Sequence, residues 1–181
     1  MLIRLAAASD AAALAAIYAH HVLHGFGTFE EVPPTPEEIE ARRRAVTAHG
    51  LPYLVAEETG RVLGYAYAAP FRPRAAYRYT VEDSVYVAPD AQGRGVGKAV
   101  LARVLDECEA LGLRQAIAVI GDSANAASIA LHDALGFAHL GVARSVGFKH
   151  GRWVDVVWMQ KSLNGGDAGA PDAAGLLLSG H

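Results

Sequence analysis

The chain has 181 residues, with 16 Lys or Arg and 19 Asp or Glu, so its formal net charge at pH 7 is −3. Because one domain commonly takes about 150 residues and the hydrophobic fraction is 52%, we expect a single soluble domain with a substantial core. The dispersed, mildly acidic charge argues against a general nucleic-acid binder, and the longest apolar run, residues 11–19, is too short to cross a bilayer.

The first third of the chain predicts one strand and two helices. Residues 2–5 read as a short strand, and Ser9-Asp10 can cap a helix that ends at residues 24–27. Thr35-Pro36-Glu37-Glu38 is typical of a second helix start, with a capping box and a proline in the first turn. That helix should end near residue 50.

The middle of the chain predicts strands. Residues 53–57 and 62–68 alternate as two strands joined across Glu58-Thr59-Gly60, which favours a hairpin. Residues 71–79 form a loop that contains three arginines, and residues 81–87 form another strand that Pro89 ends.

The remaining elements are two helices and three strands. Residues 95–111 and 125–135 are helical in pattern, each followed by a glycine. Residues 115–120 form a buried strand, and a closing hairpin joins strands at 137–148 and 153–160. The order β-α-α-β-β-β-α-β-α-β-β predicts a mixed α/β sheet with helices on its faces. The domain should occupy residues 1–163, and residues 164–181 have the composition of a flexible, low-complexity tail.

The segment richest in chemical information is a glycine-rich turn between a strand and a helix. It runs Gln92-Gly93-Arg94-Gly95-Val96-Gly97-Lys98. Such a turn and the helix that follows offer backbone N–H groups to a phosphate. The spacing matches neither the dinucleotide fingerprint nor the nucleoside-triphosphate loop.

The turn and three further segments resemble one enzyme family. The turn, which follows Ser84 to Val87, is similar to the acetyl-CoA signature of the GNAT superfamily of N-acetyltransferases. Thr80 to Val87, Asn125 to Phe137 and Gly147 to Asp155 resemble its phosphinothricin and methionine sulfoximine N-acetyltransferases. The resemblance covers residues 3–163 and implies a mostly antiparallel sheet with helices on both faces, whose splayed central strands form the acetyl-CoA cleft.

The resemblance implies which residues would bind each part of acetyl-CoA. The pyrophosphate of acetyl-CoA would lie on Gln92, Gly93, Arg94, Gly95, Val96, Gly97 and Lys98, and the pantetheine arm would pair with the edge of Val85, Tyr86 and Val87. Asn125 and Ser128 would contact the same arm. We expect no metal, because the histidines show no ligand spacing. The single cysteine, Cys108, excludes an internal disulfide and is expected to pack in the core.

Two residues are candidates for catalysis. A protonated amine needs a base before it can attack a thioester, and Glu82 at the entrance of the cofactor strand fits that role. Asp83 should face the other way, since successive strand residues alternate. His132 shares a helix face with Asn125 and either assists as a second base or protonates the leaving thiolate.

The substrate side is expected to combine an aromatic residue with cations. Phe29 resembles the aromatic that closes the pocket in these relatives, and the arginine loop could hold a carboxylate in a guanidinium fork. Arg72 is the leading cation because Pro70 and Pro73 restrict its backbone. The expected substrate contacts are Phe29, Arg72, Pro73, Arg74, Glu82, Asp83 and Ser84.

The sequence thus predicts a cytoplasmic, detoxifying acetyltransferase acting on the α-amine of a small amino acid such as phosphinothricin, methionine sulfoximine or methionine sulfone. By the resemblance it would be a homodimer, with no nucleic-acid or membrane partner. Two alternatives stay open: acetylation of another small amine or of a protein N-terminus, and a non-catalytic acyl-CoA-binding module.

Overall fold

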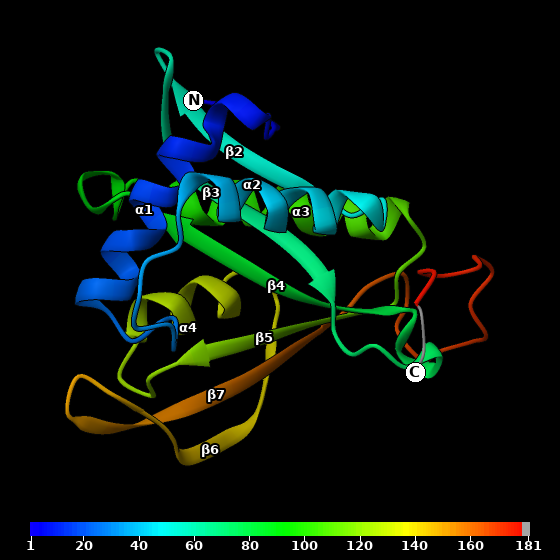
Figure 1. The fold of residues 1–181 in the computed structure, drawn as a ribbon. Helices are drawn as coiled ribbons and strands as arrows, with labels where there is room; N and C mark the ends of the chain where they lie inside the picture. The colour runs from blue at the N-terminus through cyan, green and yellow to red at the C-terminus, as the bar shows by residue number, and fades with distance from the viewer. Residues whose placement is uncertain (179–181) are drawn as a thin grey trace.

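One sheet organises the molecule, which a computed structural model describes over residues 1–178. Within these residues the sheet has seven strands in the order β1-β2-β3-β4-β5-β7-β6 (Figure 1). Every neighbouring pair is antiparallel except β4 and β5, which are parallel. The strands are β1 (Leu2–Leu5), β2 (Tyr53–Glu58), β3 (Arg61–Pro70), β4 (Thr80–Val87), β5 (Gln115–Gly121), β6 (Ala138–Lys149) and β7 (Arg152–Ser162).

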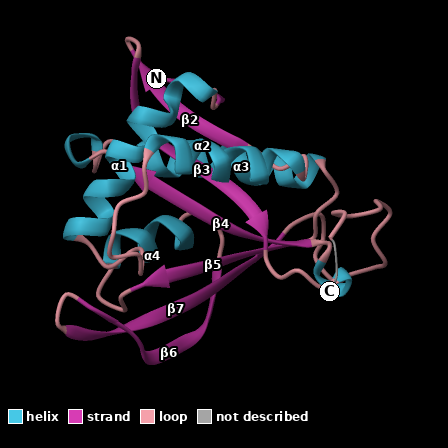
Figure 2. Cartoon of the chain, viewed as in Figure 1, coloured by secondary structure: helices cyan, strands magenta, loops and turns pink. Residues whose placement is uncertain are grey.

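In the described part of the chain, four α-helices cover the sheet on both faces (Figure 2). They are α1 (Ala11–His24), α2 (Pro36–Ala48), α3 (Val96–Ala110) and α4 (Ala126–Asp133). Tyr86 of β4 packs edge-on against Tyr18 of α1, whereas Val85 and Val87 approach Gly97 of α3. Because successive strand residues point to opposite faces, α1 and α3 lie on opposite sides of the sheet. No helix in residues 1–178 is long and apolar enough to cross a membrane.

The parallel pair is the point at which the sheet opens. β4 and β5 pair only between Thr80–Glu82 and Gln115–Ile117, and beyond these residues the two strands diverge (Figure 1). The second half of β4 therefore keeps an edge that β5 does not pair. This is the splayed mixed sheet that the sequence and its resemblance predict, and the predicted order of helices and strands is also confirmed.

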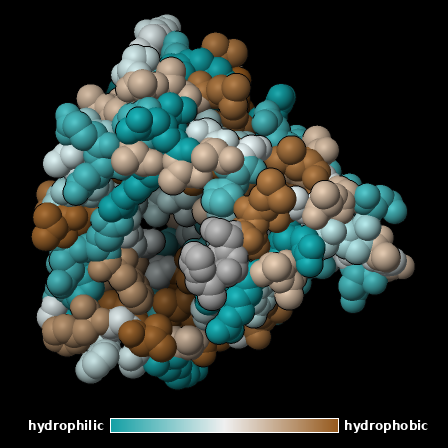
Figure 3. All heavy atoms as spheres, turned by 45° about the vertical axis from the view of Figure 1, so that its right-hand side comes forward, coloured by the Kyte–Doolittle hydropathy of each residue, from teal (hydrophilic) through white to brown (hydrophobic). Residues whose placement is uncertain are grey.

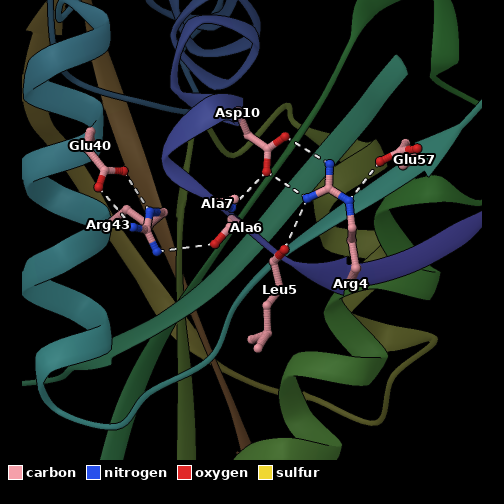
Figure 4. A network of polar contacts seen from close by, with 8 residues as sticks. All are labelled: Arg4, Leu5, Ala6, Ala7, Asp10, Glu40, Arg43 and Glu57. Carbon is pink, nitrogen blue, oxygen red and sulfur yellow. Dashed lines mark hydrogen bonds and ion pairs between the residues drawn. The ribbon is translucent and has the colours of Figure 1, made fainter. Parts of the chain in front are cut away.

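Local capping explains one helix start and not the other. At α2 the predicted capping box is present, since Thr35 Oγ1 accepts from Glu38 N–H and the Glu38 carboxylate accepts from Thr35 N–H. At α1 the expected cap is wrong, because Asp10 makes no side-chain cap bond to the helix. Its carboxylate instead accepts from Ala7 N–H and from the Arg4 guanidinium, and Arg4 also reaches Glu57 of β2 (Figure 4).

The described part of the C-terminal segment, residues 164–178, contacts the domain. Leu176 is buried, and its N–H donates to Arg78 O. The Tyr79 hydroxyl donates to Ala173 O, and Arg114 donates to Gly166 O. These contacts lie beside the loop that precedes β4. Flexibility of the segment stays a prediction, and its last three residues, 179–181, lie outside the described part.

Candidate active site

The divergence of β4 and β5 opens a cleft of about 950 Å³. Its walls are the second half of β4, the end of β5, the glycine turn before α3, the inner side of α4 and the loop after α1. Figure 3 shows the molecular surface hollowed at the height of the gap between β4 and β5. The predicted residues that line it are Phe29, Glu82, Asp83, Ser84, Val85, Tyr86, Val87, Gln92, Gly93, Gly95, Val96, Gly97, Lys98, Asn125, Ser128 and His132.

The glycine turn forms one end of the cleft. Gly93 and Gly95 have φ values of +73° and +78°, a backbone conformation that side chains disfavour. The first intrahelical bond of α3 runs from Ala99 N–H to Gly95 O, so the preceding N–H groups at the helix start are free for an anion. The turn therefore suits a phosphate group.

Arg94 departs from its predicted place in that turn. Its guanidinium donates to Glu58 in the β2–β3 hairpin at 2.7 Å, and it is absent from the lining of the cleft, whereas Lys98 is part of it. Lys98 and the backbone N–H groups thus supply the positive potential at this end.

The open edge of β4 carries a histidine that sequence reasoning missed. His21 of α1 lines the cleft, and its Nε2 lies 2.9 Å from Val87 O. Because a carbonyl oxygen only accepts, Nε2 carries the proton. Burial lowers the pKa of His21, which favours the neutral ring, and the hydrogen bond to Val87 O opposes that shift. His21 therefore closes one end of the unpaired edge that Val85, Tyr86 and Val87 present.

Glu82 lies where β4 and β5 part. It is half-buried and lines the cleft together with Ser84. Burial raises the pKa of the Glu82 carboxyl above its ordinary value, the charge of Arg72 opposes that shift, and Asp83 adds to it. A carboxylate with a raised pKa in a cleft is a stronger base than a solvated one, which suits it to accept a proton from an amine.

Asp83 faces the opposite side of β4 and meets α4. Its Oδ2 lies 3.0 Å from His132 Nε2, and both side chains are buried. His132 Nδ1 lies 2.7 Å from Ser128 O. Burial alone would lower the pKa of His132, but the hydrogen bond and charge of Asp83, together with Ser128 O and the charge of Asp133, raise it above its ordinary value. The predicted catalytic histidine thus has a carboxylate partner that the sequence placed on the substrate side.

Asn125 caps α4 at the wall of the cleft. Its side-chain oxygen accepts from Ser128 N–H at 3.2 Å, and its amide donates to Gly121 O at 3.4 Å. Asn125, Ser128 and His132 all line the cleft, as their predicted helical spacing requires. Cys108 is buried in α3, and burial raises the pKa of its thiol to about 12, in keeping with a packing role.

The predicted substrate contacts divide into two groups. Phe29 lines the cleft, and its ring packs against Gly147, where a Cβ has no room. Arg72, Pro73 and Arg74 are exposed and outside the lining. The Arg72 guanidinium stacks on the Phe71 ring with 4.4 Å between them. Its influence on Glu82 is therefore through charge rather than through contact.

A buried lysine holds the loop that carries Phe29. Lys149 Nζ, at the end of β6, donates to Gly25 O and Thr28 O, each at 2.8 Å. Burial lowers the pKa of Lys149, while Glu31 and Glu30 oppose the shift. The loop at residues 25–29 lines the cleft, so Lys149 fixes one of its walls. Within residues 1–178, no group of three or more His, Cys, Asp or Glu is placed to hold a metal ion.

Comparison with known proteins agrees with this geometry. The profile of the Acetyltransferase (GNAT) family matches residues 16–137. A phosphinothricin N-acetyltransferase of Alcaligenes faecalis is 55% identical over 170 residues, which cover 94% of this chain and 86% of the relative. An L-methionine sulfoximine/L-methionine sulfone acetyltransferase of Salmonella typhimurium is 42% identical, covering 96% of this chain and 99% of the relative.

A solved structure matches the fold over nearly its whole length. It is a GNAT superfamily phosphinothricin acetyltransferase from Sinorhizobium meliloti, crystallised in complex with AcCoA. The TM-score is 0.92 at 48% sequence identity, and the match covers 96% of this chain and 94% of that one.

Proposed function

The chain belongs to the GNAT acetyltransferase family, and from that premise we propose that it transfers an acetyl group from acetyl-CoA to the α-amine of a small amino acid. The observation that carries the proposal is the cleft between β4 and β5. It joins a glycine turn at the start of a helix, an unpaired strand edge and a half-buried carboxylate in one cavity. Phosphinothricin, methionine sulfoximine and methionine sulfone are the substrates we expect, after the relatives at 55% and 42% identity.

Different segments of the cleft would bind different parts of acetyl-CoA. Acetyl-CoA supplies an acetyl group activated as a thioester. The glycine turn and Lys98 would hold its pyrophosphate, and the free edge of β4 would pair with its amide-bearing arm. Backbone N–H groups near Val85 are our candidates for stabilising the oxyanion that develops on the carbonyl.

Glu82 is the proposed general base. An α-ammonium group cannot attack a carbonyl until it loses a proton, and the Glu82 carboxylate takes that proton directly or through one water. The amine nitrogen then forms the bond to the acetyl carbon, and the bond between that carbon and the CoA sulfur breaks. No covalent enzyme intermediate is needed, so we expect a ternary complex of enzyme, acetyl-CoA and amino acid.

We also propose that the protein is a cytoplasmic homodimer with a detoxifying role. The support for the dimer is the edge of the sheet, where β6 is the last strand and its hairpin with β7 exposes a row of large apolar side chains. They are Leu140, Val142, Val146, Phe148 and Trp153. Exposed apolar side chains gathered on one hairpin are typical of association sites. Light scattering should give twice the mass of one chain. The Trp153→Glu variant should give the mass of a single chain.

A substrate panel tests the proposal. Release of CoA thiol is followed with L-phosphinothricin, L-methionine sulfone, an uncharged primary amine and an alanine-started peptide. We expect kcat/KM to be highest for the two amino acids. Preference for the peptide would contradict the proposed substrate and indicate a protein N-terminus instead. Binding of acetyl-CoA without turnover of any amine would leave only an acyl-CoA-binding module.

A further inference from the structure

Both ring nitrogens of His132 face hydrogen-bond acceptors. Nδ1 lies 2.7 Å from the backbone carbonyl of Ser128, and Nε2 lies 3.0 Å from the carboxylate of Asp83. A carbonyl oxygen and a carboxylate oxygen both need a donor opposite them. A neutral imidazole has only one N–H, so it can satisfy only one of these two partners.

The proton count of the pair follows from this geometry. Ser128 O requires a proton on Nδ1, and Asp83 then requires a second proton between its Oδ2 and Nε2. Both side chains are 7% exposed or less, so water does not replace the missing donor. The other carboxylate oxygen, Asp83 Oδ1, is buried with no hydrogen-bond partner. The charge of this carboxylate therefore has only the imidazole opposite it, and it favours the imidazolium together with the hydrogen bond.

We propose that Asp83 is a positioning residue that keeps His132 doubly protonated at neutral pH. This inference rests on the proposed acetyl transfer. It removes His132 as a general base, because neither nitrogen has a free lone pair, and it leaves that role to Glu82. It makes His132 the source of the proton that the departing thiolate needs.

The proton transfer balances. When the bond between the acetyl carbon and sulfur breaks, the electron pair stays on sulfur as a thiolate. A free thiol has a pKa near 8.5, so a thiolate formed in the cleft, which Asp83 and His132 both line, takes the Nε2 proton out of its hydrogen bond with Asp83 as the S–H bond forms. His132 is left neutral beside the Asp83 carboxylate, and solvent reprotonates the pair before the next turnover.

Few other titratable or aromatic side chains lie near the Asp83–His132 pair. Glu82 precedes Asp83 on β4, Asp133 follows His132 on α4, and the Cys108 thiol approaches from α3. The Phe137 ring stands edge-on to the imidazole with 5.0 Å between ring centroids. Among these, only Asp83 makes a hydrogen bond to a ring nitrogen. Asp133→Asn is therefore a matched control, because it removes a neighbouring carboxylate without touching that bond.

The first test counts protons without requiring turnover. The protein is labelled with ¹⁵N at histidine, and the His132 signals are identified by their loss in His132→Gln. At pH 7 we expect both ring nitrogens of His132 to carry protons in the parent and in the control Asp133→Asn. In Asp83→Asn we expect only one of them to carry a proton. One N–H in the parent would overturn the proposal. This result is independent of whether the protein acetylates any amine.

The second test is the pH profile of kcat with saturating acetyl-CoA. In the parent, kcat should fall on the alkaline side as the pair loses its proton. Asp83→Asn should move that fall to lower pH by about one unit or more, cutting kcat at pH 8 by roughly tenfold, while KM for acetyl-CoA stays within about twofold. Asp133→Asn should shift the fall by less than a third as much. An unmoved alkaline limb in Asp83→Asn would contradict the inference, whereas an inactive parent would contradict the proposed function itself.

Discussion

Replacement of Glu82 by Gln tests the chemical step. The substitution keeps the size of the side chain and removes its ability to accept a proton. A general base contributes roughly 10²- to 10⁴-fold to the rate, and burial raises the pKa of Glu82 toward the working pH. We therefore expect kcat to fall at least about a hundredfold. Thiol release measures kcat, and calorimetry should find acetyl-CoA binding within about twofold of the parent. A kcat within twofold of the parent would refute the assignment.

The pH profile adds a second measurement of the same group. A protonated carboxyl cannot accept a proton, so kcat/KM of the parent should fall as the pH drops below the raised pKa of Glu82. The charge of Arg72 holds that pKa down, so Arg72→Ala should move the acid limb to higher pH. Arg74→Ala is the matched control, since Arg74 is exposed and is not among the groups that shift Glu82. Equal profiles for the two variants would contradict this electrostatic link.

Three further variants probe other parts of the cleft and the C-terminal segment. Gly95→Val should weaken acetyl-CoA binding at least about tenfold by calorimetry, because a branched side chain disfavours the φ of +78° at this position and the turn would have to change shape without any clash with neighbouring residues; unchanged affinity would contradict the phosphate assignment. Lys149→Met leaves two loop carbonyls without their donor, so the amino-acid KM should rise and unfolding should cost roughly 1–3 kcal/mol less; the same effects in Lys161→Met would show that they are not specific to the loop. Deletion of residues 170–181 should lower Tm by a few degrees through loss of buried Leu176, yet leave kcat within about twofold, since no residue in 164–178 lines the cleft; an unchanged Tm would show that the segment contributes no stability.

Local signals predict the elements of the fold. The capping box at Thr35 and the glycine after α3 act within a few residues, and both are present in the structure. The start of α1 was predicted less well because Asp10 has partners on β1 and β2, at Arg4 and through it Glu57. The divergence of β4 and β5 depends on pairing between distant segments. Only the resemblance to a family, and not the periodicity of the chain, indicated it.

The residues of the site also divide into those whose placement depends on nearby sequence and those whose placement depends on distant segments. The glycine turn and the alternation of Glu82 with Asp83 are local, and the structure places them as expected. His21 and Lys149 were missed because each bonds backbone carbonyls 66 or more residues away. Side-chain identity carries no signal for such partners. Arg72 was expected at the substrate because its charge is near the catalytic strand, but stacking on Phe71 keeps its guanidinium outside the cleft lining.

Product identity tests the proposed acetyl transfer most directly. The protein is incubated with acetyl-CoA and L-phosphinothricin, and the amino acid is examined by mass spectrometry with fragmentation alongside the measured release of thiol. We expect one acetyl group on the α-nitrogen for each thiol released, with the rate reduced at least about a hundredfold in Glu82→Gln. Thiol release without an N-acetylated product, or an equal yield from Glu82→Gln in the same time, would contradict transfer at this cleft.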